Sequence, residues 1–166
     1  MYKIFVGIDN GKSGSIGVVG EVVDFLQTPG NRQLSYQKSK TKYITRLDVP
    51  VFHSFLKSLV DKVGADKILI GYERPLVNSR MFTATLSAVR FLEAQLVVTE
   101  MLDIPYIYLD SKEWQKYIFP YGVRGSVALK KASLDIGNRL YPQFKNSKHP
   151  DRDGLLIAHY LREKYK

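Results

Sequence analysis

The chain has 166 residues, of which 45% are hydrophobic and 25% are charged, so it predicts one globular domain over residues 1–166. The sequence contains no cysteine, which excludes disulfides and thiolate metal sites and leaves carboxylates, histidine or carbonyls as ligands, a set that favours Mg²⁺ or Mn²⁺. A formal net charge of +9 is typical of a domain that meets nucleic acid or another anionic surface.

The N-terminal segment predicts a hairpin whose turn begins at a carboxylate. Residues 4–8 are an apolar run, Asn10-Gly11 favours a sharp turn, and residues 15–20 supply the returning strand. Residues 21–26 are expected to add a third strand. Asp9 stands where the first strand leaves the core. Aspartate is poor in strands and costly to bury unless it is paired or binds a cation, so Asp9 is either a turn former or a ligand.

Most of the positive charge falls in two segments. Residues 30–46 contain lysines and arginines without an acid, and residues 112–148 are also strongly basic. Residues 27–42 predict a polar loop or a loose ribbon. Because two separate segments carry the excess charge, we expect both to contact phosphate groups.

The middle of the chain predicts a helix followed by a second buried strand that ends on an acid. The helix begins near Asp48, which can cap it, and ends at Gly64. Residues 67–71 are a continuous apolar run, which suits a strand buried on both faces. This run leads directly to Glu73, as the first strand leads to Asp9.

The longest predicted helix covers residues 79–102 and is apolar around most of its circumference. Such a helix is expected to be buried on more than one side. One side would pack on the sheet, and the other is either a subunit interface or a surface covered by loops and a neighbouring helix. A strand at 105–109, a short helix with the only tryptophan, Trp114, and a basic helix at 126–140 follow.

The last predicted helix opens at residues 149–153, a segment that contains two aspartates. The order of strands and helices indicates an α/β mixed sheet with helices on its faces. In such a sheet the first and fourth strands can be neighbours, and the last helix can bring its first turn beside both. Clustered carboxylates repel each other and need divalent cations. Two Mg²⁺ ions about 3.5–4 Å apart are the usual arrangement for phosphodiester chemistry.

Three motifs in this order resemble the RuvC-type Holliday junction resolvases of the RNase H-like superfamily: GIDNGKSG, IGYERP and DRDGLLIAHYL. The resemblance covers nearly the whole chain, and the small size is similar to that of bacteriophage members. It implies an RNase H-like mixed five-stranded sheet flanked by helices. It also implies an Mg²⁺-dependent endodeoxyribonuclease, with two ions per active site and Mn²⁺ as a substitute, that resolves Holliday junctions and related branched DNA by paired nicking.

Carried over to this sequence, the resemblance matches Asp9 to the first catalytic aspartate, Glu73 to the central glutamate and Asp153 to the last aspartate. Family members often have another acid or a histidine three residues before the last aspartate, where this chain has Pro150. Asp151 is expected to take that role as a ligand, although an acid in the first turn of a helix also stabilises the helix dipole. His149 is expected to be a ligand or a general base.

The resemblance further implies a homodimer that places two active sites on a four-way junction, with helix 79–102 at its interface. The loop at 73–81 would face the junction centre, and the basic segments would follow the DNA backbones, which reads DNA shape rather than base sequence. The expected DNA-binding residues are Arg74, Asn78, Arg80, Lys38, Lys40, Lys42, Arg124, Lys130 and Lys131.

Other functions remain open from the sequence. The chain could be an RNase H-like or flap nuclease, or a junction-binding module without catalysis. An actin-like ATP-binding domain also starts with a strand, a DxG turn and a hairpin, but it needs a second lobe that 166 residues do not hold. The sequence shows neither a signal-peptide pattern nor a run judged long and apolar enough to span a membrane, so we expect a cytoplasmic protein without a membrane partner, in the host bacterial cytoplasm if a phage encodes it.

Overall fold

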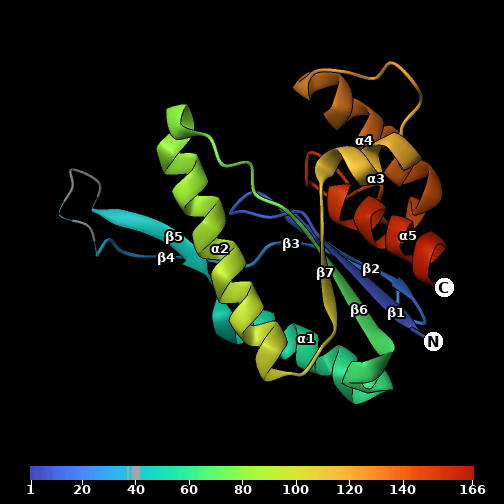
Figure 1. Ribbon diagram of the computed structural model, residues 1–166, viewed down its shortest axis with the longest axis horizontal. Helices are drawn as coiled ribbons and strands as arrows, with labels where there is room; N and C mark the ends of the chain where they lie inside the picture. The colour runs from blue at the N-terminus through green and yellow to red at the C-terminus, as the bar shows by residue number, and fades with distance from the viewer. Residues whose placement is uncertain (37, 39–41) are drawn as a thin grey trace.

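A mixed five-stranded sheet forms the centre of a computed structural model of the protein, which describes residues 1–36, 38 and 42–166 (Figure 1). The strand order is β3-β2-β1-β6-β7. The strands are β1 (Ile4–Ile8), β2 (Ser15–Gly20), β3 (Asp24–Gln27), β6 (Ile68–Glu73) and β7 (Tyr106–Leu109). β1, β2 and β3 are antiparallel neighbours, whereas β1, β6 and β7 run parallel. The predicted mixed sheet and the pairing of its first and fourth strands are therefore confirmed.

Helices cover both faces of this sheet (Figure 1). The helices are α1 (Val49–Val63), α2 (Phe82–Met101), α3 (Ser111–Ile118), α4 (Ser126–Leu140) and α5 (Asp153–Tyr165), with short 3₁₀ turns at Ala65–Lys67, Ser79–Met81 and Pro142–Phe144. Alternate residues of β1 point to opposite faces, as strand geometry requires. Ile4 and Val6 share a buried cluster with residues of α1 and α2, whereas Phe5 joins a second cluster with Trp114 of α3 and Leu156 of α5.

Helix α5 lies unusually close to β1 and β2 because glycines face it. A Cβ atom on Gly7 would lie 2.3 Å from the carbonyl oxygen of Gly154, and one on Gly17 would lie 2.3 Å from the nitrogen of Leu155. Only glycine leaves room for such contact between two backbones. The first turn of α5 is therefore held beside the end of β1, as the sequence predicted.

A two-stranded antiparallel ribbon projects from the body beside α2 (Figure 1). It consists of β4 (Gly30–Leu34) and β5 (Tyr43–Leu47). The sequence predicted a loop or loose ribbon over 27–42 and missed β5. Every residue of β4 is exposed, so β4 shows no alternation of hydrophobic and polar residues that would indicate a strand pair. The third strand is at 24–27 rather than 21–26, since the positive φ of Gly20 introduces a turn before it.

Helix α2 is buried unevenly along its length in this chain. Its C-terminal half is packed in the core, with Phe91 and Val98 buried, whereas Phe82 at its start is 67% exposed in this chain. Residues 79–101 are long and apolar enough to cross a membrane by length and composition alone, which corrects the expectation that no run meets that test. The test is weak evidence here, because the core helix of a globular domain passes it too, and the C-terminal half of α2 packs on the sheet.

Candidate active site

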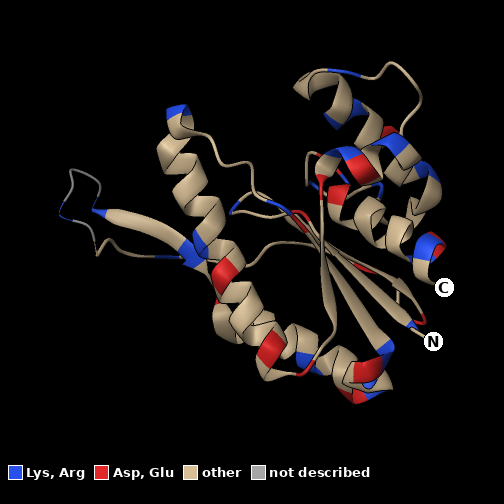
Figure 2. Cartoon of the chain, viewed as in Figure 1, with Lys and Arg blue, Asp and Glu red and all other residues tan. Residues whose placement is uncertain are grey.

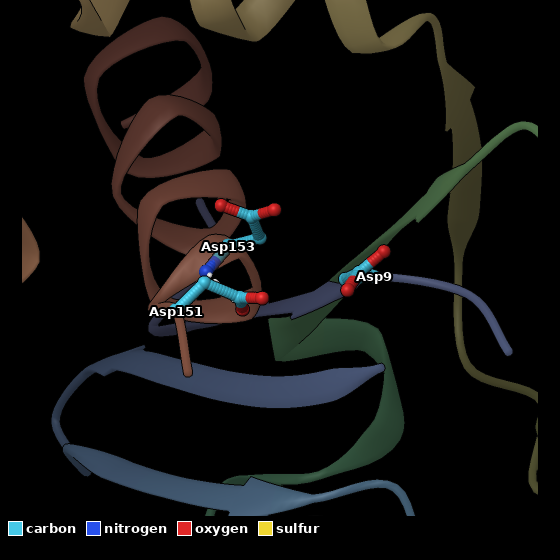
Figure 3. Close-up of side chains that lie close together, drawn as sticks. All are labelled: Asp9, Asp151 and Asp153. Atoms are coloured by element: carbon cyan, nitrogen blue, oxygen red, sulfur yellow. Dashed lines mark hydrogen bonds between the residues drawn. The ribbon is translucent and has the colours of Figure 1, made fainter. Parts of the chain in front are cut away.

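Carboxylates from distant parts of the chain meet at one edge of the sheet (Figure 3). Asp9, Asp151 and Asp153 each place a carboxylate oxygen within 4.8 Å of the other two. Glu73 lies at the same edge, because β1 and β6 run parallel and Ile8 is paired with Tyr72 directly before the two acids. Asp9 and Glu73 also line a cavity of about 210 Å³ between the sheet and the start of α2. The structure thus brings three of the four predicted acids within 4.8 Å of one another and places Glu73 at the same edge, where its charge acts on Asp9.

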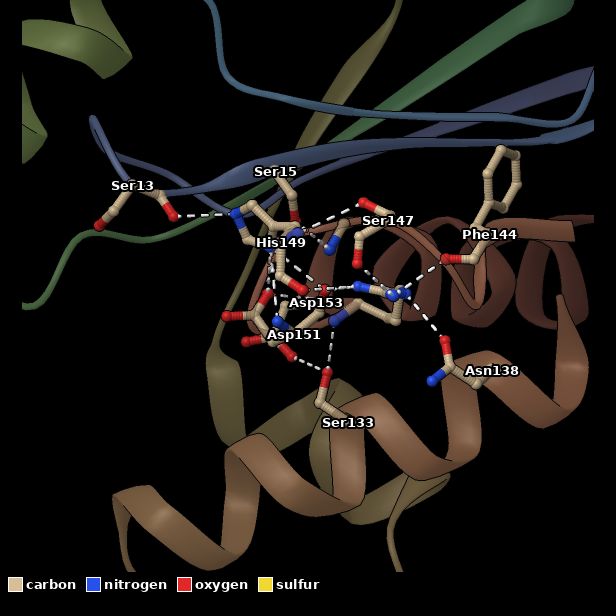
Figure 4. A network of polar contacts seen from close by, with 11 residues as sticks. Ser13, Ser15, Ser133, Asn138, Phe144, Ser147, His149, Asp151 and Asp153 are labelled. Atoms are coloured by element: carbon tan, nitrogen blue, oxygen red, sulfur yellow. Dashed lines mark hydrogen bonds and ion pairs between the residues drawn. The ribbon is translucent and has the colours of Figure 1, made fainter. Parts of the chain in front are cut away.

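The acids at the start of α5 are held by serines from two other elements (Figure 4). The hydroxyl of Ser133 on α4 donates to the carboxylate of Asp153 and accepts a bond from the backbone N–H of Arg152 at 3.0 Å. The backbone N–H of Gly154 donates to the hydroxyl of Ser15 on β2 at 3.1 Å. α5 is therefore fixed at its first turn to both α4 and the sheet.

Glu73 has a partner that sequence reasoning missed. The indole Nε1–H of Trp114 donates to Oε2 of Glu73 over 3.0 Å, and the Trp114 side chain is fully buried. A buried indole needs an acceptor, so a lone tryptophan shortly after the strand at 105–109 was the available signal. The bond uses Oε2 of Glu73 and fixes the direction of the carboxylate. The other carboxylate oxygen, Oε1, takes no part in this bond.

Burial and the charges of neighbouring acids raise the pKa values of three of the four acids. Burial, followed by the charges of Glu73, Asp153 and Asp151, raises the pKa of Asp9 well above its ordinary value. Burial and the neighbouring charge of Asp153 raise the pKa of Glu73 to about 7. Burial and the charge of Asp151 raise the pKa of Asp153 to about 6. The ammonium group of Lys130 acts in the opposite direction on the three aspartates.

His149 contacts Asp151, one of the clustered acids, through its Nδ1 atom. Its Nδ1 lies 3.1 Å from the backbone oxygen and 3.3 Å from Oδ1 of Asp151, and its Nε2 lies 3.1 Å from the carbonyl oxygen of Ser13. Burial opposes the charged imidazolium, but these acceptors outweigh burial and raise the pKa of His149. Burial likewise raises the pKa of Asp151, but the bond and charge of His149 outweigh it and lower that pKa.

This arrangement bears on the role predicted for His149. Both ring nitrogens of His149 have hydrogen-bond partners within the chain, Nδ1 at the backbone of Asp151 and Nε2 at the Ser13 carbonyl, so neither is left free for a metal ion or a substrate proton. The geometry thus favours a hydrogen-bond partner of Asp151 over the predicted ligand or general base.

The donor set fits a divalent cation. All four acids offer oxygen ligands, which Mg²⁺ and Mn²⁺ prefer, and they come from separate segments that the fold holds rigidly together. Burial, and after it the charges of the neighbouring acids, raise the pKa values of Asp9, Glu73 and Asp153. A bound cation would remove that repulsion.

The residues expected to contact DNA lie on three surfaces around the acids. On the loop after β6, Arg74 forms an ion pair with Asp110 at 3.3 Å, and Asn78 accepts a bond from the backbone N–H of exposed Arg80 at 3.0 Å. Arg124, Lys130 and Lys131 are exposed at or just before the first turns of α4.

The third surface is the β4–β5 ribbon. Lys38 and Lys42 are exposed there, and Lys40 lies outside the described residues. The guanidinium Nε of Arg90 donates to the Tyr36 hydroxyl at 2.8 Å and ties the ribbon to α2.

No protein-family model matches the sequence, and no curated protein matches it. Among solved structures, the chain is similar to T. thermophilus RuvC in complex with a Holliday junction substrate, with a TM-score of 0.59, 15% identity, and coverage of 98% of this chain and 96% of that chain. It is also similar to a second Thermus thermophilus RuvC structure, with a TM-score of 0.52, 14% identity, and coverage of 97% and 96%. The fold is therefore that of RuvC-type, RNase H-like proteins, as the motifs predicted.

Proposed function

We propose that the protein is a divalent-metal-dependent endonuclease that resolves Holliday junctions and related branched DNA by paired nicking as a homodimer in the cytoplasm. The observation that carries the proposal is the meeting of Asp9, Glu73, Asp151 and Asp153 at one sheet edge of a RuvC-type fold. When bound there, two Mg²⁺ ions, or Mn²⁺ in their place, would activate the attacking water and stabilise the leaving 3′ oxygen.

The chain's own residues have distinct parts in this proposal. Asp9 would be a central ligand, because its carboxylate lies within 4.8 Å of those of Asp151 and Asp153 and is also near the charge of Glu73. Glu73 is oriented by Trp114, and Asp153 by Ser133. Asp9, Glu73 and Asp153 are half-buried, which reduces their contact with bulk water and strengthens the charge interactions at the site.

Lys130 supplies a positive charge that acts on three of the acids. Its ammonium group lowers the pKa of Asp9, Asp151 and Asp153, so it lies within electrostatic reach of the cluster while its side chain is exposed. That position suits contact with the phosphate to be cleaved.

The DNA would follow the basic surfaces on either side of the acids. Figure 2 shows lysines and arginines on the β4–β5 ribbon, at the start of α2 and along α4. The proposed phosphate contacts are Arg74, Asn78, Arg80, Lys38, Lys42, Arg124, Lys130 and Lys131, with Lys40 added from the sequence. Contacts of this kind position DNA without reading its bases, and they weaken as salt rises.

The exposed apolar start of α2 supports the proposed homodimer. Leu76, Val77 and Phe82 are 79%, 74% and 67% exposed, and Met81 is also exposed beside them. A contiguous apolar patch on a surface is typical of an interaction site. A second copy on this patch would set the separation of two active sites, and that separation would select four-way junctions by shape.

A nicking assay tests the proposal. Wild type, Asp9→Asn and the exposed control Asp61→Asn are incubated with a four-way junction, a flap, a linear duplex and an RNA–DNA hybrid, with Mg²⁺, Mn²⁺ or chelator. We expect paired, metal-dependent nicks in the junction for wild type and Asp61→Asn, and none for Asp9→Asn. Sedimentation should give a dimer.

Each other outcome assigns a different function. Cleavage confined to the hybrid or the flap would replace the resolvase by an RNase H-like or flap nuclease. Junction binding without cleavage under any metal would leave a binding module. ATP hydrolysis without DNA would favour the actin-like alternative.

A further inference from the structure

Arg152 is a charged side chain in an unusual place. It stands between Asp151 and Asp153, and its relative exposure is 0%. Arginine is almost never fully buried unless its charge is paired. The contacts of Arg152 therefore need an explanation that neither the motifs nor the proposed catalytic residues supply.

The guanidinium of Arg152 uses all five of its N–H donors on oxygen atoms. The acceptors are Oδ1 of Asn138 at 3.0 Å and the backbone oxygens of His149 at 2.9 Å, Asp151 at 2.7 Å, Phe144 at 3.0 Å and Ser147 at 3.3 Å. Four of the five acceptors are thus carbonyl groups of the connector at residues 144–151.

These bonds wrap the connector, residues 144–151, around the positive charge of Arg152. A carbonyl group in a polar loop ordinarily faces water, but here the carbonyls turn inward to the guanidinium. Asp151 lies at the end of this closed loop, and His149 in the same loop donates to the Ser13 carbonyl in the turn that follows Asp9. The loop is thereby tied to the turn beside Asp9 as well as to α5.

Two further neighbours, on α4 and on β3, pack against Arg152. Its stem lies on Gly137 of α4, where an added Cβ would stand 2.3 Å from the Arg152 Cβ, and its guanidinium lies 5.2 Å from the ring centre of Phe25 on β3. A lysine at this position would have three N–H donors on a flexible stem, whereas arginine has five in a planar group. It would keep the positive charge but lose some of the hydrogen bonds to the backbone carbonyls.

We propose that Arg152 is a positioning residue that holds the Asp151 carboxylate at its distance from Asp9 and Asp153, and so sets the affinity of the site for divalent cations. The proposal rests on the proposed function only in taking the acidic cluster as the metal site. Outer contacts that orient metal ligands typically contribute about 10-fold to 100-fold in affinity when removed.

The test compares Arg152→Lys with the control Arg162→Lys, which lies on α5, is partly exposed and contacts Glu163. Mn²⁺ binding without DNA is followed by the loss of the free-ion signal in electron paramagnetic resonance. Trypsin cleavage after Lys145 and Lys148, both exposed within the connector, reports whether the loop stays closed. Junction nicking is measured against Mn²⁺ concentration.

We expect Arg152→Lys to bind Mn²⁺ about 10-fold more weakly or worse, to be cut faster in the connector, and to recover nicking at high Mn²⁺. Arg162→Lys should match wild type in all three measurements. Wild-type Mn²⁺ affinity in a folded Arg152→Lys protein would overturn the proposal.

Two further outcomes are assigned in advance. If Arg152→Lys does not fold, Asn138→Ala, which removes one acceptor, decides by the same measurements: weaker Mn²⁺ binding supports the proposal and unchanged binding overturns it. If wild type binds Mn²⁺ but nicks no DNA, the proposed function fails while the positioning role stands or falls on the binding data. If wild type binds no Mn²⁺, both the proposed function and the positioning role fail. Faster trypsin cleavage of Arg152→Lys than of wild type would then show only that Arg152 stabilises the connector.

Discussion

Replacing Glu73 by glutamine is expected to stabilise the metal-free protein at pH 8 by about 3 kcal/mol, although Glu73 is a proposed metal ligand. The pKa of Glu73 is about 7 in the folded chain against an ordinary value of 4.5. Each unit of pKa difference corresponds to about 1.4 kcal/mol. An ionised Glu73 therefore costs the fold about 3 kcal/mol at pH 8, and glutamine removes that charge while keeping an oxygen for the Trp114 indole.

The sign of the pH dependence follows from the direction of the pKa change. A carboxyl group with a raised pKa contributes its full stability below its unfolded value of 4.5, and this stability is lost as pH rises through about 7. The gain from Glu73→Gln should accordingly be below about 1 kcal/mol at pH 5 and near its maximum at pH 8.

Urea unfolding in chelator at pH 5 and pH 8 measures both values. Glu93→Gln is the matched control, because Glu93 is exposed on α2, and its effect should stay within about 0.5 kcal/mol. With saturating Mn²⁺ the wild type should be more stable than Glu73→Gln, because the wild type gains binding free energy that the variant has lost. A destabilised Glu73→Gln protein at pH 8 in chelator, or a gain equal at both pH values, would refute the reasoning.

Three further predictions concern the neighbours of the site. Gly17→Ala should lower the free energy of unfolding by about 3 kcal/mol in urea titrations and abolish nicking, because its Cβ would lie 2.3 Å from the backbone nitrogen of Leu155; equal stability would contradict the close approach of α5. Trp114→Phe should weaken Mn²⁺ binding by about 10-fold in a resonance titration, since it keeps an aromatic ring but loses the N–H donor to Glu73, and unchanged affinity would show that the bond does not orient the acid. Lys130→Met should move the rising limb of the pH–nicking profile to higher pH, because the ammonium group lowers the pKa of the aspartates, and a shift to lower pH would contradict that placement.

Local patterns were sufficient for the sheet and for the positions of the acids. Apolar runs that end in Asp9 and Glu73 predict buried strands because side-chain burial follows strand periodicity, and two parallel neighbours must end at one edge of a sheet. Helix α1 was predictable from its cap at Asp48 and its stop at Gly64. The strand β5 was not, because its partner β4 is wholly exposed and the ribbon depends on pairing rather than on a hydrophobic face.

The sequence by itself determined which acids stand at the ends of buried elements, and it placed Asp151 and Asp153 before the last helix. Only the tertiary structure decided how those acids are held. Three contacts hold them: the Trp114 indole bonds to Glu73, His149 bonds to the Ser13 carbonyl, and Arg152 bonds to backbone carbonyls of residues 144–151. No periodic pattern in the sequence links the residues of each pair. A motif records which residue types a site needs, whereas hydrogen bonds between distant segments depend on where the packed helices bring them.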